Sequence, residues 1–216
     1  MWFLIVFLCV LHVWSIDRKP RWIFYCSKAA PILLMSALIF SGSPDPKQYA
    51  YWIGIGLIAS AIGDLFLMHP KDKFVEGLTS FLIAHIMYSY AFFSQVDSPL
   101  TLWVPAILFS VGLIVYLLLL PALENTKLAV GMYTSAILAM AWGAIEVWLH
   151  VQSPTVTYAV MGAFTFIVSD LVLAIDRFRS SSAFSRHVIM ITYYSAQILL
   201  TLSALGISYA SIGFKP

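Results

Sequence analysis

Four ionisable side chains lie inside long apolar segments of the sequence: Lys28, Asp64, His85 and Asp170. An ionisable group inside a membrane helix costs roughly 2.5–3.5 kcal/mol on insertion scales, so such a residue is expected to have a function. Two carboxylates in a low-dielectric site tend to separate into one protonated acid and one carboxylate, the pair that general acid and base catalysis requires. Asp64 and Asp170 are therefore the predicted catalytic residues, and they suit hydrolysis without a metal or cofactor.

Other polar side chains accompany these two carboxylates. Counting from the nearest predicted helix ends places the set about 8–16 Å from one membrane face, at 1.5 Å per residue. His85 and Tyr88 are spaced i,i+3, as are Tyr194 and Gln197, so each pair shares a helix face. Glu76 begins a predicted helix on the same side. The predicted substrate-binding residues of this pocket are Lys28, Glu76, His85, Tyr88, Tyr133, Tyr194 and Gln197.

Two other interpretations of the polar residues stay open. A zinc site is one, because His69, His85 and His187 all lie in the same half of the membrane, although His85 lies about two helical turns deeper than the others. The second is that Lys28 pairs with one aspartate and the remaining groups only join helices through hydrogen bonds. The sequence has no G-x-S-x-G motif, glycine-rich phosphate loop or Cys-His nucleophile pair.

The composition is that of a polytopic membrane protein. Hydrophobic residues make up 61% and charged residues 10% of the 216 residues, far from the average of soluble domains. Apolar segments of about 20 residues match the hydrocarbon thickness of a bilayer, and no alternating barrel pattern appears. We therefore expect an all-α fold in a single transmembrane domain, with eight transmembrane helices at about 2–16, 21–41, 48–69, 74–95, 99–120, 127–150, 154–178 and 186–212.

Lys and Arg residues orient these helices. Nine of them lie in the odd-numbered loops or beside them, and only Lys47 and Lys215 lie on the opposite side. The positive-inside rule then makes the odd loops cytoplasmic and both termini non-cytoplasmic, in the cytoplasmic membrane if the source is bacterial. The net charge of +2 excludes a nucleic-acid partner. The nine residues are Arg18, Lys19, Arg21, Lys71, Lys73, Lys127, Arg177, Arg179 and Arg186.

An internal repeat links the two halves of the chain. The segment 62–67 resembles 168–173, and the same offset aligns Asp64 with Asp170 and Tyr88 with Tyr194. Residues 28–35 resemble 133–140, one residue out of that register. We predict tandem, parallel repeats at 1–98 and 99–216, with a site between them. A lipid or small-solute transporter is an alternative function for such a bundle.

Four short motifs resemble the lysoplasmalogenase family, the YhhN-like polytopic membrane proteins, and together they span most of the chain. The resemblance implies a membrane-embedded hydrolase that cleaves the vinyl ether bond of lysoplasmalogen to a fatty aldehyde and glycerophosphoethanolamine or glycerophosphocholine. Its partners would be the lysophospholipid substrate and membrane lipids. The motifs are Gly63-Asp64-Leu65-Phe66-Leu67, Phe74-x-x-Gly77-Leu78-x-x-Phe81-x-x-Ala84-His85-x-x-Tyr88, Gly162-Ala163-x-x-Phe166-x-x-Ser169-Asp170 and Tyr193-Tyr194-x-Ala196-Gln197.

The polar residues fit the implied reaction. One aspartic acid would protonate an alkenyl carbon, and the other carboxylate would stabilise the resulting cation and accept a proton from water. The sequence does not distinguish which aspartate has which role. Lys28 is predicted to contact the lipid phosphate, while the tyrosines and Gln197 orient the glycerol and the water.

Overall fold

The computed structural model describes residues 1–42, 48–151 and 153–210. Lys47, Lys215 and the predicted end of the last helix at 211–212 lie outside the described residues. Within those ranges the chain forms eight α-helices and two short 3-10 helices, and no strand. The elements are α1 (Trp2–Ser15), α2 (Arg21–Gly42), α3 (Gln48–Leu67), α4 (Phe74–Phe93), α5 (Trp103–Leu119), η1 (Leu120–Ala122), η2 (Glu124–Thr126), α6 (Lys127–His150), α7 (Val156–Phe178) and α8 (Ala183–Ala210).

Each predicted helix corresponds to one of these eight, and the two largest differences in start position have local causes. Helix α5 begins at Trp103 instead of residue 99. There the backbone N–H and the hydroxyl of Thr101 both donate to the Glu146 carboxylate, which holds the preceding segment outside the helix. Helix α8 begins at Ala183 instead of residue 186 because the Ser182 hydroxyl accepts a hydrogen bond from the Ser185 N–H and caps the helix.

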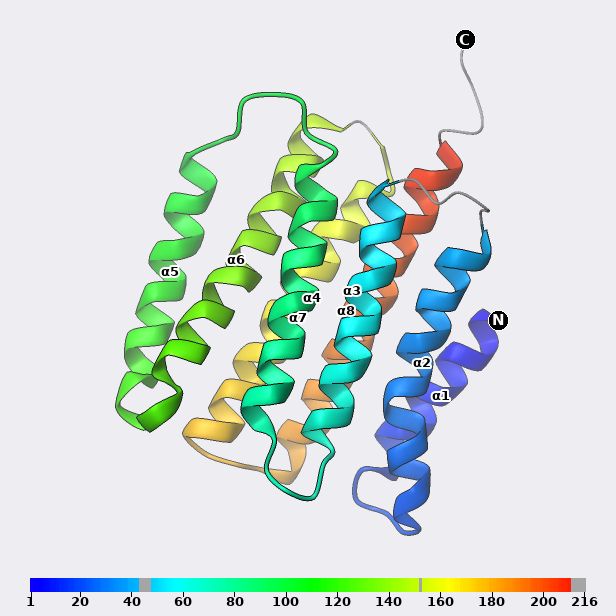
Figure 1. Ribbon diagram of the computed structural model, residues 1–216, viewed down its shortest axis with the longest axis vertical. Helices are drawn as coiled ribbons and strands as arrows, with labels where there is room; N and C mark the ends of the chain where they lie inside the picture. The colour runs from blue at the N-terminus through cyan, green and yellow to red at the C-terminus, as the bar shows by residue number, and fades with distance from the viewer. Residues whose placement is uncertain (43–47, 152, 211–216) are drawn as a thin grey trace.

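The helices run up and down in a bundle, so alternate loops gather at opposite ends (Figure 1). The loops 16–20, 68–73, 120–126 and 179–182 lie together at the lower end in this view, which we call the odd-loop end. Helix α8 packs against α7 and also contacts α1, α2 and α3. It therefore connects the first half of the bundle to the second.

Close helix contacts in the first half depend on small residues. A Cβ atom added at Gly63 would lie 2.7 Å from the ring of Phe81, and one added at Gly77 would lie 2.7 Å from Leu67. Glycine at both positions lets α3 and α4 approach closely, as is common between membrane helices. Helix α5 differs, since its main helix partner is α6 and many of its apolar side chains are exposed at the edge of the bundle (Figure 1).

The chain is an integral membrane protein. Six helical stretches in the described residues are long and apolar enough to cross a membrane; they contain α2, α3, α5, α6, α7 and α8. Helix α1 is shorter, with 14 residues, and α4 is long enough but carries many polar side chains. Eight membrane spans and the tandem repeat therefore stay predictions.

Candidate active site

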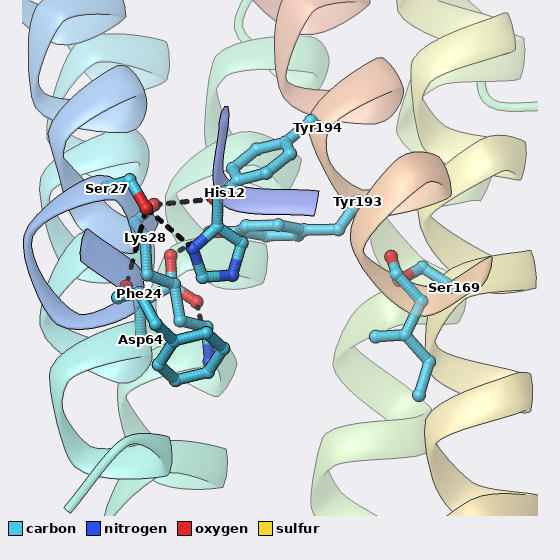
Figure 2. Close-up of polar contacts among 9 residues, drawn as sticks. His12, Phe24, Ser27, Lys28, Asp64, Ser169, Tyr193 and Tyr194 are labelled. Atoms are coloured by element: carbon cyan, nitrogen blue, oxygen red, sulfur yellow. Dashed lines mark hydrogen bonds and ion pairs between the residues drawn. The ribbon is translucent and has the colours of Figure 1, made fainter. Parts of the chain in front are cut away.

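Asp64 lies on α3, one turn before the helix ends, and both of its carboxylate oxygens have partners. Its Oδ2 accepts a hydrogen bond from the Tyr193 hydroxyl at 2.8 Å. Its Oδ1 lies 3.5 Å from the ammonium Nζ of Lys28 on α2. Asp64 is 2% exposed and Lys28 is 8% exposed. Figure 2 shows this cluster, in which the Tyr194 hydroxyl also donates to the backbone oxygen of Lys28 at 2.9 Å.

Asp170 on α7 has a different set of partners. The Tyr133 hydroxyl on α6 donates to its Oδ2 at 2.5 Å. Within the described part of the chain, Asp170 forms no ion pair, and no side chain bonds its Oδ1. Asp170 as a whole is only partly buried. Asp64 is thus held by a cation and a phenol, whereas Asp170 is held by a phenol alone.

One cavity of about 520 Å³ brings the two carboxylates together at the odd-loop end. Its volume falls within the range typical of small-molecule sites. Lys28, Asp64 and Asp170 all line it. These three residues therefore line one cavity between helices of both halves, whereas Tyr133, predicted at the same depth, does not line it.

Basic residues surround the cavity mouth. Arg177 forms an ion pair with Asp72 at 2.5 Å, and Arg186 with Asp17 at 3.0 Å. The hydrogen bond from Arg177 holds the pKa of the Asp72 carboxyl below its ordinary value. The mouth is thus positively charged, with part of the charge neutralised by aspartates. The cations that line the cavity there are Arg21, Lys73, Arg177 and Arg186.

Lys73 and Arg21 complete this set. Lys73 lies 3.7 Å from Glu76, whose side chain is 49% exposed and does not line the cavity. Arg21 donates to the backbone oxygen of Ile16 and lies over the ring of Phe24. In the described residues it forms no ion pair. Of the four cations at the mouth, Arg21 is thus the one without an ion-pair partner among the described residues.

Of the seven predicted binding residues, all of which are described, Lys28 lines the cavity, and the other six lie away from its lining: Glu76, His85, Tyr88, Tyr133, Tyr194 and Gln197. The Tyr88 hydroxyl donates to Oε1 of Gln197 at 2.8 Å and lies 3.3 Å from the Ser60 hydroxyl. His85 is fully buried, with its ring 4.7 Å from Phe166 and 5.1 Å from Tyr133. These groups join α3, α4, α6, α7 and α8 beside the site.

Several residues that line the cavity were not predicted as site residues from the sequence, among them Arg21, His12 and Tyr193. His12 on α1 is fully buried and lines the cavity, with its Nδ1 3.1 Å from the Ser27 hydroxyl. Tyr193 lines the cavity too, although it was noted only as part of a motif (Figure 2). Helical spacing did point to α8, but the i,i+3 pair of Tyr194 and Gln197 drew attention to the neighbouring positions.

The three histidines considered for zinc lie in separate places. His69 lines the cavity mouth, His85 is buried among aromatic rings, and His187 lies 3.8 Å from Asp17. Among the residues that the structure describes, no three His, Cys, Asp or Glu side chains form a cluster able to hold a metal ion.

Known proteins resemble the chain along most of its length. The YhhN family matches residues 23–204. The Bos taurus protein named lysoplasmalogenase TMEM86A is 33% identical over 211 residues, which cover 91% of this chain and 84% of the relative. The Homo sapiens protein named lysoplasmalogenase TMEM86B is 32% identical over 201 residues, with 93% and 82% covered.

A bacterial relative is more distant. The Escherichia coli O157:H7 protein named uncharacterized membrane protein YhhN is 23% identical over 197 residues, which cover 89% of this chain and 94% of the relative. No solved structure matches the chain.

Proposed function

Since the chain belongs to the YhhN family, we propose that it is a membrane hydrolase that cleaves the vinyl ether bond of a lysoplasmalogen. The names of the mammalian relatives support the substrate class. The observation that carries the proposal is the pair of unlike carboxylates, Asp64 and Asp170, in one cavity of an apolar helix bundle. Acid-catalysed hydrolysis needs a proton donor and a stabilising anion, and these two residues supply them.

The reaction proceeds in three balanced steps. A proton adds to the alkenyl carbon remote from the oxygen and leaves an oxocarbenium cation. Water adds to the carbon bonded to oxygen and releases a proton, which gives a hemiacetal. The hemiacetal C–O bond then breaks as its hydroxyl loses a proton and the leaving glycerol oxygen gains one, so that the hydrocarbon chain leaves as an aldehyde. One carboxyl group gives a proton in the first step, the other takes a proton from water in the second, and transfer of that proton to the first carboxylate restores the site.

The partners of the two carboxylates support a division of these roles. The Lys28 ammonium and the Tyr193 phenol stabilise Asp64 as an anion, so Asp64 stabilises the oxocarbenium cation and accepts the proton from water. Asp170 has no counter-cation in the described residues, and its Oδ1 has no side-chain partner there. Asp170 is therefore the acid that protonates the alkenyl carbon, while Tyr133 holds the other oxygen.

The head group lies at the cavity mouth in this scheme. Arg21 contacts the lipid phosphate, because it has no ion-pair partner among the described residues and a guanidinium forms bidentate bonds to phosphate. Lys28 is instead engaged with Asp64, which places it beside the reacting bond. Asp176, which also lines the mouth, would meet the ammonium group of ethanolamine or choline.

Purified protein in detergent tests the function directly. We expect lysoplasmalogen to yield aldehyde and the glycerophospho head group in equal amounts, while a lysolipid with a saturated alkyl ether yields neither. Activity should persist in EDTA, because no step in this scheme uses a metal. Loss in EDTA with restoration by zinc would favour the metallohydrolase, and no aldehyde from well-folded protein would favour a transporter.

A further inference from the structure

An apolar pocket lies beside the polar cavity, between α4, α5, α6 and α7. It has a volume of about 190 Å³ and is lined mainly by aliphatic and aromatic side chains, among them Leu78, Val115 and Ile137. We call it the α4–α7 pocket. Apolar cavities of about 150 Å³ stay dry and take up hydrocarbon, so this pocket favours a hydrocarbon occupant over water.

Asp170 lines both the polar cavity and the α4–α7 pocket. Phe74 and Leu173 are also shared by the two linings. The carboxyl of Asp170 is thus the ionisable group at the junction between a charged space and an apolar one. A molecule that fills both spaces would have the boundary between its polar and hydrocarbon parts beside Asp170.

We propose that the α4–α7 pocket binds the hydrocarbon chain of the substrate and thereby places the bond to be cleaved against Asp170. This inference rests on the proposed function. In a lysoplasmalogen, the vinyl ether is the place where the polar glycerol meets the hydrocarbon chain. With the phosphate at Arg21 and the chain in the pocket, that bond lies at the junction where the proposed acid stands.

The position of α5 explains how a chain reaches the pocket from the membrane. Val111 and Val115 of α5 line the pocket, yet α5 packs mainly against α6 and lies at the edge of the bundle (Figure 1). Val111 is 56% exposed on a helix that carries no charged side chain and is mostly apolar. The pocket wall is therefore formed by a helix in contact with lipid, and a chain enters sideways without leaving the apolar phase.

Chain-length preference tests the assignment. Ala174 on α7 lines the α4–α7 pocket but not the polar cavity, so Ala174→Phe should fill the pocket and leave the carboxylates in place. Each methylene displaced costs about fourfold in binding, so losing two or more should lower kcat/KM for an 18-carbon substrate at least about 15-fold. A substrate with a chain of two or three carbons, which is too short to fill the pocket, should be affected much less. Ala106→Phe, on the exposed side of α5, is the matched control and should keep the wild-type profile.

Photolabelling gives a second readout that needs neither catalysis nor a folded variant. The probe is a lysophospholipid with a saturated alkyl ether, which cannot be hydrolysed, and a diazirine at the end of its chain. In the wild-type protein the label should fall on peptides of α5, α6 or α7 that line the pocket. A label on α1 and α2, or an unchanged chain-length profile in Ala174→Phe, would overturn the chain site. If the wild type releases no aldehyde, the proposed function is overturned instead. The two failures can be told apart because labelling with this probe does not depend on catalysis.

Discussion

Asp64 and Asp170 occupy matching positions in the predicted repeat, yet the residues next to them differ in charge. The repeat aligns Lys28 with Tyr133, one residue out of register, and these two side chains contact Asp64 and Asp170 respectively. A cation stands in one half of the bundle where a phenol stands in the other. In the proposed mechanism this difference keeps Asp64 an anion and lets Asp170 carry a proton, which is the division of roles that acid-base hydrolysis needs.

Replacing either carboxylate by an amide should abolish most of the activity. Asp64→Asn and Asp170→Asn keep the size of the side chain, but an amide neither donates a catalytic proton nor carries negative charge. We expect each variant to lose at least about 100-fold in aldehyde release, the lower range for a positioned acid or base. Asp97→Asn, an exposed residue at the opposite end of the bundle, is the control and should match the wild type. Full activity in both variants would refute the two-carboxylate mechanism.

Replacing Lys28 and replacing Arg21 should have different effects on kcat and KM. Lys28→Met removes the cation beside Asp64, so it should lower kcat more than it raises KM. Arg21→Gln removes only a head-group contact, so it should raise KM with little change in kcat. Steady-state kinetics on lysoplasmalogen gives both constants, and Arg18→Gln, which changes a cation outside the cavity lining, is the control. A pure KM effect of Lys28→Met would return Lys28 to the phosphate site expected from the sequence alone.

The sequence predicted how deep these side chains lie in the membrane, but not the direction in which each one points around its helix axis. Counting residues from helix ends places Lys28, Asp64, Tyr133 and Asp170 at one depth, and all of these except Tyr133 line one cavity. The count does not say which way a side chain points around its helix axis. Tyr193 reaches Asp64, while the adjacent Tyr194 bonds the backbone of Lys28, because the packing of α8 against α2 and α3 sets that direction.

At the scale of helices, the length of the apolar segments and the Pro, Gly and Ser residues between them were sufficient to predict the elements. Most of the bounds agree within a few residues, since a membrane helix must bond all its backbone groups internally over the hydrocarbon thickness. The starts of α5 and α8 differ because side chains cap or tether the backbone there, through Glu146 and Ser182. Such contacts form between specific partners in space and leave little trace in composition.

The contact between α7 and α8 offers a prediction at this scale. A Cβ atom at Gly162 would lie 3.1 Å from Leu200 and 3.2 Å from the backbone oxygen of Ala196, and a backbone cannot move aside easily. Gly162→Leu should separate the helices that carry Asp170 and Tyr193. Overpacking typically costs about 1–3 kcal/mol, and displacement by about 1 Å lowers catalysis about 100-fold.

A thermal unfolding assay in detergent and aldehyde release measure the two effects together. Gly42→Ala is the control, because a Cβ atom there would meet Leu205 at an ordinary 3.9 Å. If Gly162→Leu unfolds at the wild-type temperature and keeps full activity, the α7–α8 distance does not position the site.

The whole molecule presents a charged cavity at one end and an apolar pocket at its side. This arrangement matches the substrate class, because a lysolipid in a membrane leaflet has its head group at the surface and its chain in the hydrocarbon layer. The cations at the cavity mouth lie at the odd-loop end, where the positive-inside rule places the cytoplasm. The substrate would therefore come from the cytoplasmic leaflet, and the water-soluble product would leave on that side.

Topology and product release can be measured in the same membranes. Reporter tags at either terminus should report the non-cytoplasmic side, and a tag inserted at 180–182 should report the cytoplasm. In sealed inside-out vesicles from a bacterial host, the cavity mouth then faces the medium, so the glycerophospho head group should appear outside as lysoplasmalogen is consumed. In right-side-out vesicles it should stay trapped until detergent is added. A cytoplasmic C-terminus, or release from right-side-out vesicles alone, would reverse the orientation and place the cavity at the opposite leaflet.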